Sequence, residues 1–295
     1  MNHGASLIEP RPFPCQTSAM ANPVSLAAYL ARIGLMAAPS PDADGLAHLQ
    51  AAHRNAIAFE NLDVRLGRPI RIDGESSFDK LVTRRRGGYC FEPNRLFADM
   101  LAALGLPSRP LLARVLLGAL PGETPPRTHV LLLLEIGGQP WIADAGFGAS
   151  YAPPLPLRDG VAVTTPDGAT HRLRHGSAPN SWLLDRRTGE DWQPQYMFDL
   201  APVAPADLEQ CNHWTSTRAD SRFTTAHIVT IATPAGFLTM NDRVLTIWQE
   251  GASERREIQD AQDYGATLTG IFGLAITPDE IAALPLFAGA PHSLS

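Results

Sequence analysis

A single cysteine stands in the stretch RRRGGYCFEPN, residues 84–94, directly after two glycines. Glycine accepts backbone angles and close approaches that other residues forbid, so Gly87 and Gly88 could form a tight turn that presents Cys90. A helix that begins at or just after Cys90 would favour the thiolate through the partial positive charge of its N-terminus. Its first amides could also donate to the oxygen of a carbonyl that the sulfur attacks. Cys90 is therefore a candidate nucleophile, although a lone cysteine is more often a small buried side chain.

A thiol nucleophile needs a base, and the base needs a partner that orients it. Among nine histidines, His129 stands out because it begins the strongly apolar stretch 129–134 at the end of a predicted strand. Asp144 lies in the next predicted strand, and an isolated acid among apolar residues requires a polar partner. The hairpin turn expected between these strands would place His129 and Asp144 close to opposite each other. Cys90, His129 and Asp144 then form a chemically complete set.

The elements that would position these residues begin with helices, because the first hundred residues have helical apolar spacing. We expect four helices, over 24–35, 41–59, 76–86 and from near 90 to 104. The third opens with Ser76 and has Asp79 three places on, the pattern of a capping box. Pro93 falls in the first turn of the fourth helix, where a missing N–H costs nothing.

Short apolar segments bounded by glycine and proline follow, which indicates strands. They cover 111–118, 128–136, 139–145, 161–164, 170–174 and 181–187, and after a helix over 206–217 they resume over 227–233, 236–240 and 243–249. Gly137-Gly138 is a two-residue hairpin turn between the second and third strands. Helices followed by strands and a mixed end predict an α+β fold with segregated layers.

Composition excludes several classes of protein. The chain has 295 residues, 44% hydrophobic and 18% charged, which allows a large core. A net charge of −6 without a long basic stripe argues against a nucleic-acid partner. Three distant cysteines, Cys15, Cys90 and Cys211, suggest no disulfide framework, and the motif CNHW lacks the second pair of ligands that a metal site needs.

The N-terminal twenty residues have no apolar core of signal-peptide length, and Met20 could be the physiological start. The longest apolar stretch, VLLLLEI, contains a glutamate and is too short to span a bilayer. We therefore expect a cytoplasmic protein without a membrane partner, in a reducing compartment where a thiol stays reduced.

Four stretches resemble the arylamine N-acetyltransferase family in sequence and in order. They are AFENLDV (58–64), RGGYCFEPN (86–94), THVLLLLEIGGQPWIADAGFG (128–148) and CNHWTSTRADSRFT (211–224), and the resemblance covers roughly residues 24–275. Pro93 departs from the residues common at its position in the family, which could alter the pitch of the amides behind the sulfur.

The resemblance implies a three-part fold around a thiol-protease-like Cys-His-Asp core, carried onto Cys90, His129 and Asp144. The parts would be an N-terminal helical bundle, a central antiparallel β-barrel and a C-terminal α/β lid, over residues 21–106, 107–204 and 205–295, after a disordered extension over 1–20.

The resemblance also implies an activity: transfer of an acetyl group from acetyl-CoA to arylamines, hydrazines or arylhydroxylamines, without a metal. The kinetics would be ping-pong, through an acetyl-cysteine, in a monomer or homodimer that serves xenobiotic metabolism. Phe59 and Phe147 match positions that line the acceptor site, and Thr128 and Phe223 match positions that touch the acyl donor. Gly146, like its neighbour Gly148, would let the backbone approach the ligand; packing of the phenylalanines in the core is the alternative.

Glu60 and Arg86 flank the site in sequence, and we expect them to pair and hold the cysteine loop. Three other functions remain open: a thiol hydrolase or transglutaminase, an amide synthase that releases a polyketide chain from a carrier protein, and a small-molecule binding protein without activity. The presence of all three catalytic residue types argues against a binding protein without activity.

Overall fold

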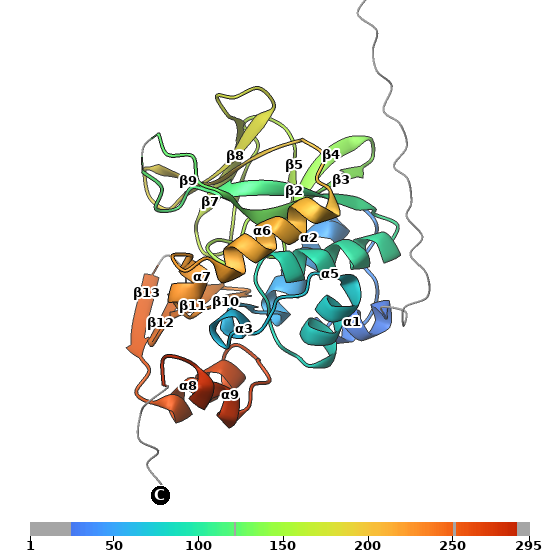
Figure 1. The fold of residues 1–295 in the computed structure, drawn as a ribbon. Coiled ribbons are helices and arrows are strands. Elements are labelled where there is room, and N and C mark those ends of the chain that lie inside the picture. Colours follow the sequence, from blue (N-terminus) through green and yellow to red (C-terminus); the bar gives the residue numbers. More distant parts are fainter. Residues whose placement is uncertain (1–24, 121, 250–251, 288–295) are drawn as a thin grey trace, which may run out of the picture.

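The computed structural model describes residues 25–120, 122–249 and 252–287. The predicted N-terminal extension and Cys15 lie outside these residues. Within them the elements run from helices to strands to a mixed C-terminal part, and Figure 1 shows these groups as separate layers. The α+β class predicted from the sequence is confirmed.

The helical part precedes the first long strand. Its elements are α1 (Leu26–Arg32), α2 (Ala43–Ala56), α3 (Leu62–Arg65), α4 (Gly74–Phe78), the π-helix η1 (Asp79–Thr83) and α5 (Phe91–Ala103). The helices predicted near the ranges of α1, α2 and α5 are confirmed, with ends a few residues inside the predicted limits. Apolar side chains of these three helices pack together with Leu132 and Leu134 of the central sheet.

The helix predicted over 76–86 differs from the prediction at both ends. It begins earlier, because Asp73 is the N-cap and its carboxylate accepts a hydrogen bond of 2.8 Å from the backbone N–H of Ser76. It also ends earlier, because Arg85 adopts a φ of 50° and turns the chain before Gly87 is reached. The capping box on Ser76 was therefore wrong: Ser76 receives the cap instead of providing it.

An eight-stranded antiparallel sheet follows, in the order β5-β4-β3-β2-β9-β8-β7-β6. Its strands are β2 (Ser108–Val115), β3 (Arg127–Ile136), β4 (Gln139–Ala143), β5 (Leu155–Pro156), β6 (Ala162–Thr164), β7 (Thr170–His175), β8 (Ser181–Arg187) and β9 (Trp192–Asp199). Among the described residues β5 and β6 pair on one side alone, so the sheet is antiparallel, as predicted, and forms an open half-barrel in place of the predicted β-barrel. The strands β5 and β9 were not predicted.

The hairpin of β3 and β4 carries the candidate histidine and leads to the candidate aspartate. Its turn is Gly137-Gly138, as predicted, and both φ angles are positive, at 58° and 76°, which suits the two-residue turn of a hairpin. Successive residues of β3 are buried on opposite faces: Leu131 contributes to the core inside the half-barrel, whereas Leu132 packs against the helices. Burial on both faces explains why the middle of the strand, residues 130–134, is apolar without alternation.

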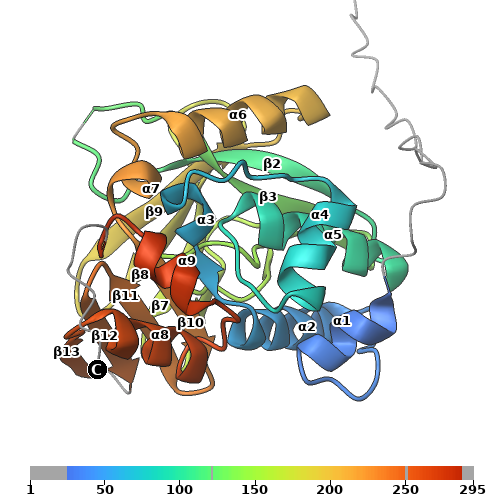
Figure 2. The ribbon, with the colours of Figure 1, turned by 60° about the horizontal axis from the view of Figure 1, so that its bottom comes forward.

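A second antiparallel sheet, in the order β1-β10-β11-β12-β13, occupies the C-terminal part. Its strands are β1 (Phe59–Glu60), β10 (Ile228–Thr233), β11 (Gly236–Asn241), β12 (Val244–Gln249) and β13 (Ala252–Glu257), and the helices around them are α6 (Pro205–Thr217), α7 (Arg222–Thr225), α8 (Ala261–Gly270) and α9 (Pro278–Ala283). In Figure 2, α8 and α9 lie beside this sheet, and their apolar side chains share a core with it. The strand β1 lies in the helical part of the sequence but pairs within the C-terminal sheet, so these two parts share a sheet. The predicted division into three domains therefore stays a prediction.

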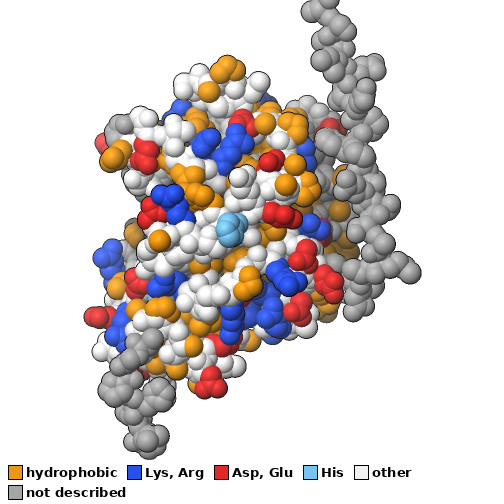
Figure 3. Space-filling model, in the orientation of Figure 1, with side chains coloured by type: hydrophobic (Ala, Val, Ile, Leu, Met, Phe, Trp, Pro, Cys, Tyr) orange, Lys and Arg blue, Asp and Glu red, His pale blue; other side chains and the backbone are white. Residues whose placement is uncertain are grey.

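The face of the molecule shown in Figure 3 is not dominated by one charge. Basic and acidic side chains lie close to one another on it, with apolar side chains scattered between them. Across the described ranges, no helix combines the length and the apolar character needed to cross a bilayer.

The revised helix start can be tested by two substitutions. Asp73→Ala should lower the free energy of unfolding by about 1 kcal/mol, because the Ser76 N–H loses its capping partner. Ser76→Ala should change it by less than about 0.5 kcal/mol, since the backbone N–H remains. Urea denaturation of both variants measures the difference, and a larger loss in Ser76→Ala would restore the predicted capping box.

Candidate active site

A cavity of about 520 Å³ contains nearly all of the residues singled out from the sequence. It is lined by the predicted catalytic residues Cys90 and His129 and by all five predicted substrate contacts, Phe59, Thr128, Gly146, Phe147 and Phe223. Other lining residues come from the half-barrel, from α6 and α7 and from the second sheet, so the cavity lies where the layers meet. Asp144, the remaining predicted residue, lies behind His129.

Cys90 is the residue directly before α5, as predicted, and is 2% exposed. Its Sγ lies 3.5 Å from the carbonyl oxygen of Thr128, the neighbour of His129. Burial raises the pKa of the thiol and outweighs the backbone amides of Val130 and Phe91, which favour the thiolate. The net shift is opposite to the one expected from the helix N-terminus alone. Burial thus favours the thiol over the thiolate, so the chemistry requires a base that takes the proton before the sulfur attacks.

His129 is paired with Asp144, as predicted. The distance between its Nε2 and Oδ2 of Asp144 is 2.7 Å, and both residues are almost fully buried. The pairing is diagonal: the hairpin register joins Leu132 to Ala143 and stops there, so the next residue, Asp144, which the register would set opposite Leu131, faces the histidine from beyond the end of β4. The sequence thus located the pair, and the departure of the chain from the strand after Ala143 brings it together.

The carboxylate of Asp144 is held on several sides. Its Oδ1 accepts from Nδ2 of Asn94 at 3.1 Å and from the N–H of Gly146 at 3.0 Å. Burial raises the pKa of this carboxyl, but His129, Asn94 and Arg54 together outweigh burial, and the pKa is lowered. Asp144 is therefore ionised at neutral pH. An ionised carboxylate can only accept, so Nε2 of His129 carries the proton and Nδ1 is the basic nitrogen.

Aromatic side chains fix the plane of the histidine ring. The ring centroid of His129 lies 4.9 Å from that of Phe147 and 5.0 Å from that of Tyr196, which themselves meet edge to face. Phe147 thus lines the cavity and packs against the histidine at once. The two alternatives considered for it, cavity lining and core packing, both hold.

Gly146 and Gly148 allow their backbone to lie close to other residues of the protein. A Cβ atom on Gly146 would lie 2.9 Å from the Cα and the carbonyl oxygen of Cys90. A Cβ atom on Gly148 would lie 2.7 Å from the ring of Phe59. The Asp144–Gly148 turn thus fits closely against Cys90 and Phe59, and the approach of a ligand to these two glycines stays a prediction.

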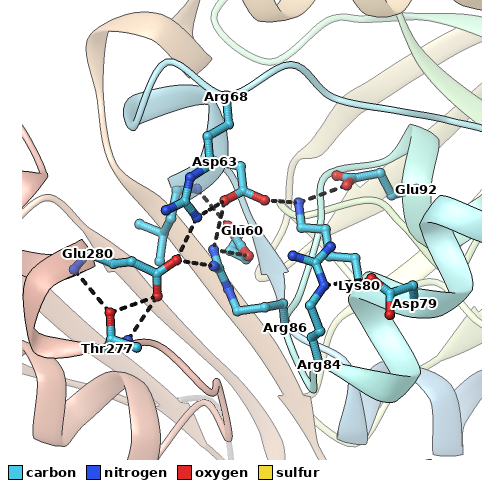
Figure 4. A network of polar contacts seen from close by, with 11 residues as sticks. Glu60, Asp63, Arg68, Asp79, Lys80, Arg84, Arg86, Glu92, Thr277 and Glu280 are labelled. Carbon is cyan, nitrogen blue, oxygen red and sulfur yellow. Dashed lines mark hydrogen bonds and ion pairs between the residues drawn. The ribbon is translucent and has the colours of Figure 1, made fainter.

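Glu60 and Arg86 form the predicted ion pair, at 2.9 Å between Oε1 and Nη2, and both side chains are buried. Figure 4 shows that the pair belongs to a larger network that also includes Asp63, Lys80 and Glu92. Nζ of Lys80 lies 2.8 Å from a carboxylate oxygen of Asp63 and 2.8 Å from one of Glu92. Burial lowers the pKa of Lys80, but the surrounding carboxylates outweigh it and the pKa is raised.

This network supports the loop that precedes Cys90. Glu92 accepts a hydrogen bond of 3.1 Å from the N–H of Tyr89, and a Cβ atom on Gly88 would lie 2.7 Å from its carboxylate. Arg86 also approaches Glu280 of α9 at 3.5 Å, so the C-terminal helices take part. Gly87 and Gly88 thus serve close packing, and neither has a positive φ.

Several site residues were missed by the sequence analysis. Asn94 donates to Asp144 and to the carbonyl oxygen of Val130 and accepts from the N–H of Ala145. Gln50 of α2 accepts from the backbone N–H of Asp144 at 2.8 Å. A signal existed for Asn94, which ends the quoted motif one helical turn after Cys90; Gln50 gave none. Within the described ranges, no cluster of three or more His, Cys, Asp or Glu side chains could hold a metal ion.

Known proteins are similar to this chain in both sequence and fold. A family model described as N-acetyltransferase matches residues 42–281. The arylamine N-acetyltransferase of Escherichia coli K12 is 38% identical over 264 residues, 86% of this chain and 92% of the relative's length. The arylamine N-acetyltransferase of Mycolicibacterium smegmatis is 34% identical over 256 residues, 85% of this chain and 92% of its own length.

Two solved structures agree with the whole architecture. The arylamine N-acetyltransferase of Salmonella typhimurium superimposes with a TM-score of 0.84 at 35% identity, covering 90% of this chain and 98% of that one. The enzyme of Mycobacterium marinum, solved in complex with CoA, gives a TM-score of 0.81 at 32% identity, with 88% and 98% covered. The fold is thus that of a class of acyltransferases. The chain is a member of the arylamine N-acetyltransferase family, and the resemblance noted from the four motifs is confirmed.

The close fit at Gly146 predicts a local requirement for glycine. Gly146→Ala should lower turnover on the order of a hundredfold, because the added methyl group displaces Cys90 or Asn94 from its position. Gly270→Ala is the matched control, since nothing lies within 4 Å of its Cβ position and its φ is not positive. Steady-state kinetics of both folded variants measure the effect, and an equally active Gly146→Ala would show that the turn can move without consequence.

The buried ion pair predicts a loss of stability. Glu60→Gln should lower the free energy of unfolding by roughly 3–5 kcal/mol, because Arg86 is left buried without its closest partner. Asp79→Asn removes the exposed pair of Asp79 with Arg84 and should cost less than about 1 kcal/mol. Thermal and urea denaturation compare the two. A Glu60→Gln protein with normal stability and no activity would instead place Glu60 in the chemistry.

Proposed function

We propose that this protein transfers an acetyl group from acetyl-CoA to the nitrogen of an arylamine or hydrazine, or to an arylhydroxylamine, through an acetyl-cysteine on Cys90. One observation carries the proposal: Cys90 and His129 line the same cavity, and the histidine is oriented by a buried, ionised Asp144. Membership of the family and the CoA bound to the M. marinum enzyme support acetyl-CoA as the donor.

In the first half-reaction Nδ1 of His129 takes the thiol proton, and the Cys90 sulfur attacks the thioester carbonyl carbon. A new C–S bond forms, the bond to the sulfur of coenzyme A breaks, and the leaving thiolate recovers the proton from His129. Asp144 stabilises the imidazolium that exists in between. The N–H of Phe91, the first amide of α5, lies beside the sulfur and could stabilise the oxyanion.

In the second half-reaction the neutral nitrogen of the acceptor attacks the acetyl carbon. The C–S bond to Cys90 breaks, His129 removes a proton from the nitrogen, and the sulfur regains it as the thiol. Because coenzyme A leaves before the acceptor reacts, the kinetics should be ping-pong. The aromatic side chains Phe59 and Phe147 suit a flat, apolar acceptor, and we place the acceptor beside them, with Thr128 and Phe223 on the side of the acyl donor.

Intact-protein mass spectrometry tests the proposal directly. After brief incubation with acetyl-CoA and no acceptor, the wild type should gain a single acetyl group that maps to Cys90 and disappears when aniline is added. Cys90→Ser should gain none that aniline discharges. Cys211→Ser is the matched control, because Cys211 lies in α6 outside the lining of the cavity. In this variant the acetyl adduct on Cys90 should form as in the wild type.

The same measurement separates the alternative functions. A folded wild type with a reduced Cys90 and no adduct would contradict the acetyl donor, and other acyl thioesters and acyl carrier proteins would then be tested for the amide synthase. Turnover of peptides or simple amides without coenzyme A would instead indicate the thiol hydrolase.

A further inference from the structure

The side chain of Asn61, between β1 and α3, holds a turn that lies more than 160 residues later in the sequence. Its Nδ2 donates to the carbonyl oxygens of Phe223 at 2.8 Å and Ala226 at 2.7 Å, and its Oδ1 accepts from the N–H of Ile228 at 2.8 Å. The residue is 1% exposed. Asn61 stands at the N-cap of α3, a position where asparagine normally caps its own helix, yet its amide makes no capping hydrogen bond there.

The turn that Asn61 holds forms one wall of the cavity. Phe223 and Ile228 lie at its two ends, and both line the cavity together with Cys90. The ring of Phe223 contacts that of Phe59, 6.0 Å between centroids, and that of Tyr89, 5.4 Å between centroids. The strand directly before Asn61 in the sequence, β1, pairs with β10 and so adjoins the same wall. The position of this wall relative to Cys90 therefore depends on Asn61.

We infer that Asn61 is a positioning residue that keeps the wall of Phe223 and Ile228 closed over the acetyl-cysteine, and that it thereby decides whether an amine or water discharges this intermediate. The inference rests on the proposed function. A thioester on Cys90 is open to water as well as to amines, and an apolar wall that excludes water suppresses hydrolysis. Water attack would add at the acetyl carbon, break the bond to Cys90, and release acetate and the thiol.

The role assigned to Asn61 is not a contact with substrate. Its amide faces backbone groups of residues 223–228, and Asn61 is absent from the residues that line the cavity. Loss of the amide leaves two carbonyl oxygens and one N–H without this partner, which should loosen the turn while Cys90, His129 and Asp144 keep their own contacts.

The test follows the fate of the acetyl adduct. Wild type and Asn61→Ala are loaded with acetyl-CoA, freed of excess donor by gel filtration, and followed by intact-protein mass spectrometry with and without aniline. In Asn61→Ala the adduct should be lost to water faster, by on the order of tenfold, while its transfer to aniline slows. Rates are expressed per acetylated molecule, so a lower folded yield does not affect them. Asn55→Ala, an exposed change in α2, should match the wild type.

A double-mutant cycle shows whether Asn61 acts through the wall. If it does, Asn61→Ala combined with Phe223→Ala should hydrolyse no faster than Phe223→Ala alone, because the wall is already lost. Fully additive effects, or an Asn61→Ala protein with wild-type rates and merely a lower melting temperature, would overturn the inference. A wild type that forms no adduct would overturn the proposed function itself, and this inference with it.

Discussion

The arrangement of the site depends on one buried contact, between the carboxylate of Asp144 and the imidazole of His129. A carboxylate in an apolar interior is costly unless hydrogen bonds and charges compensate it. The compensation comes from Asn94, from the N–H of Gly146 and from the histidine itself, and more distantly from Arg54. These partners come from α2, α5 and the half-barrel. The pair can therefore exist only where the layers meet, and this fixes where the cavity lies.

The cysteine is held by a separate set of charges. Cys90 follows a loop whose backbone packs against Glu60 and Glu92, and these carboxylates are neutralised by Arg86 and Lys80. A buried network of this kind adds little net stability, since desolvation offsets the attraction, but it specifies one geometry because any misplaced charge would be left unpaired. The nucleophile and the base are thus positioned by two polar networks, one around Arg86 and Lys80 and one around Asp144.

The cavity takes its form from the segments that surround His129. The space beside this histidine is bounded by the half-barrel, by the second sheet and by the turn that Asn61 holds. The walls nearest to the sulfur are aromatic, which suits flat acceptors, and they come from segments far apart in the chain. A small shift of any one segment therefore alters access to the thiol.

The sequence by itself determined the helices around α1, α2 and α5, the hairpin of β3 and β4, and the three residues Cys90, His129 and Asp144, because helical and alternating apolar patterns and a glycine pair are local signals. It also located Glu60 and Arg86, since isolated charges need partners. Only the tertiary structure decided that the sheet stays open, that β1 pairs with β10, and that Gln50, Asn94 and Asn61 support the site. These features depend on contacts between distant segments, and an amide side chain in a sequence carries no sign of the backbone group that it will meet. The raised pKa of the Cys90 thiol has the same origin, because burial is a property of the packed structure.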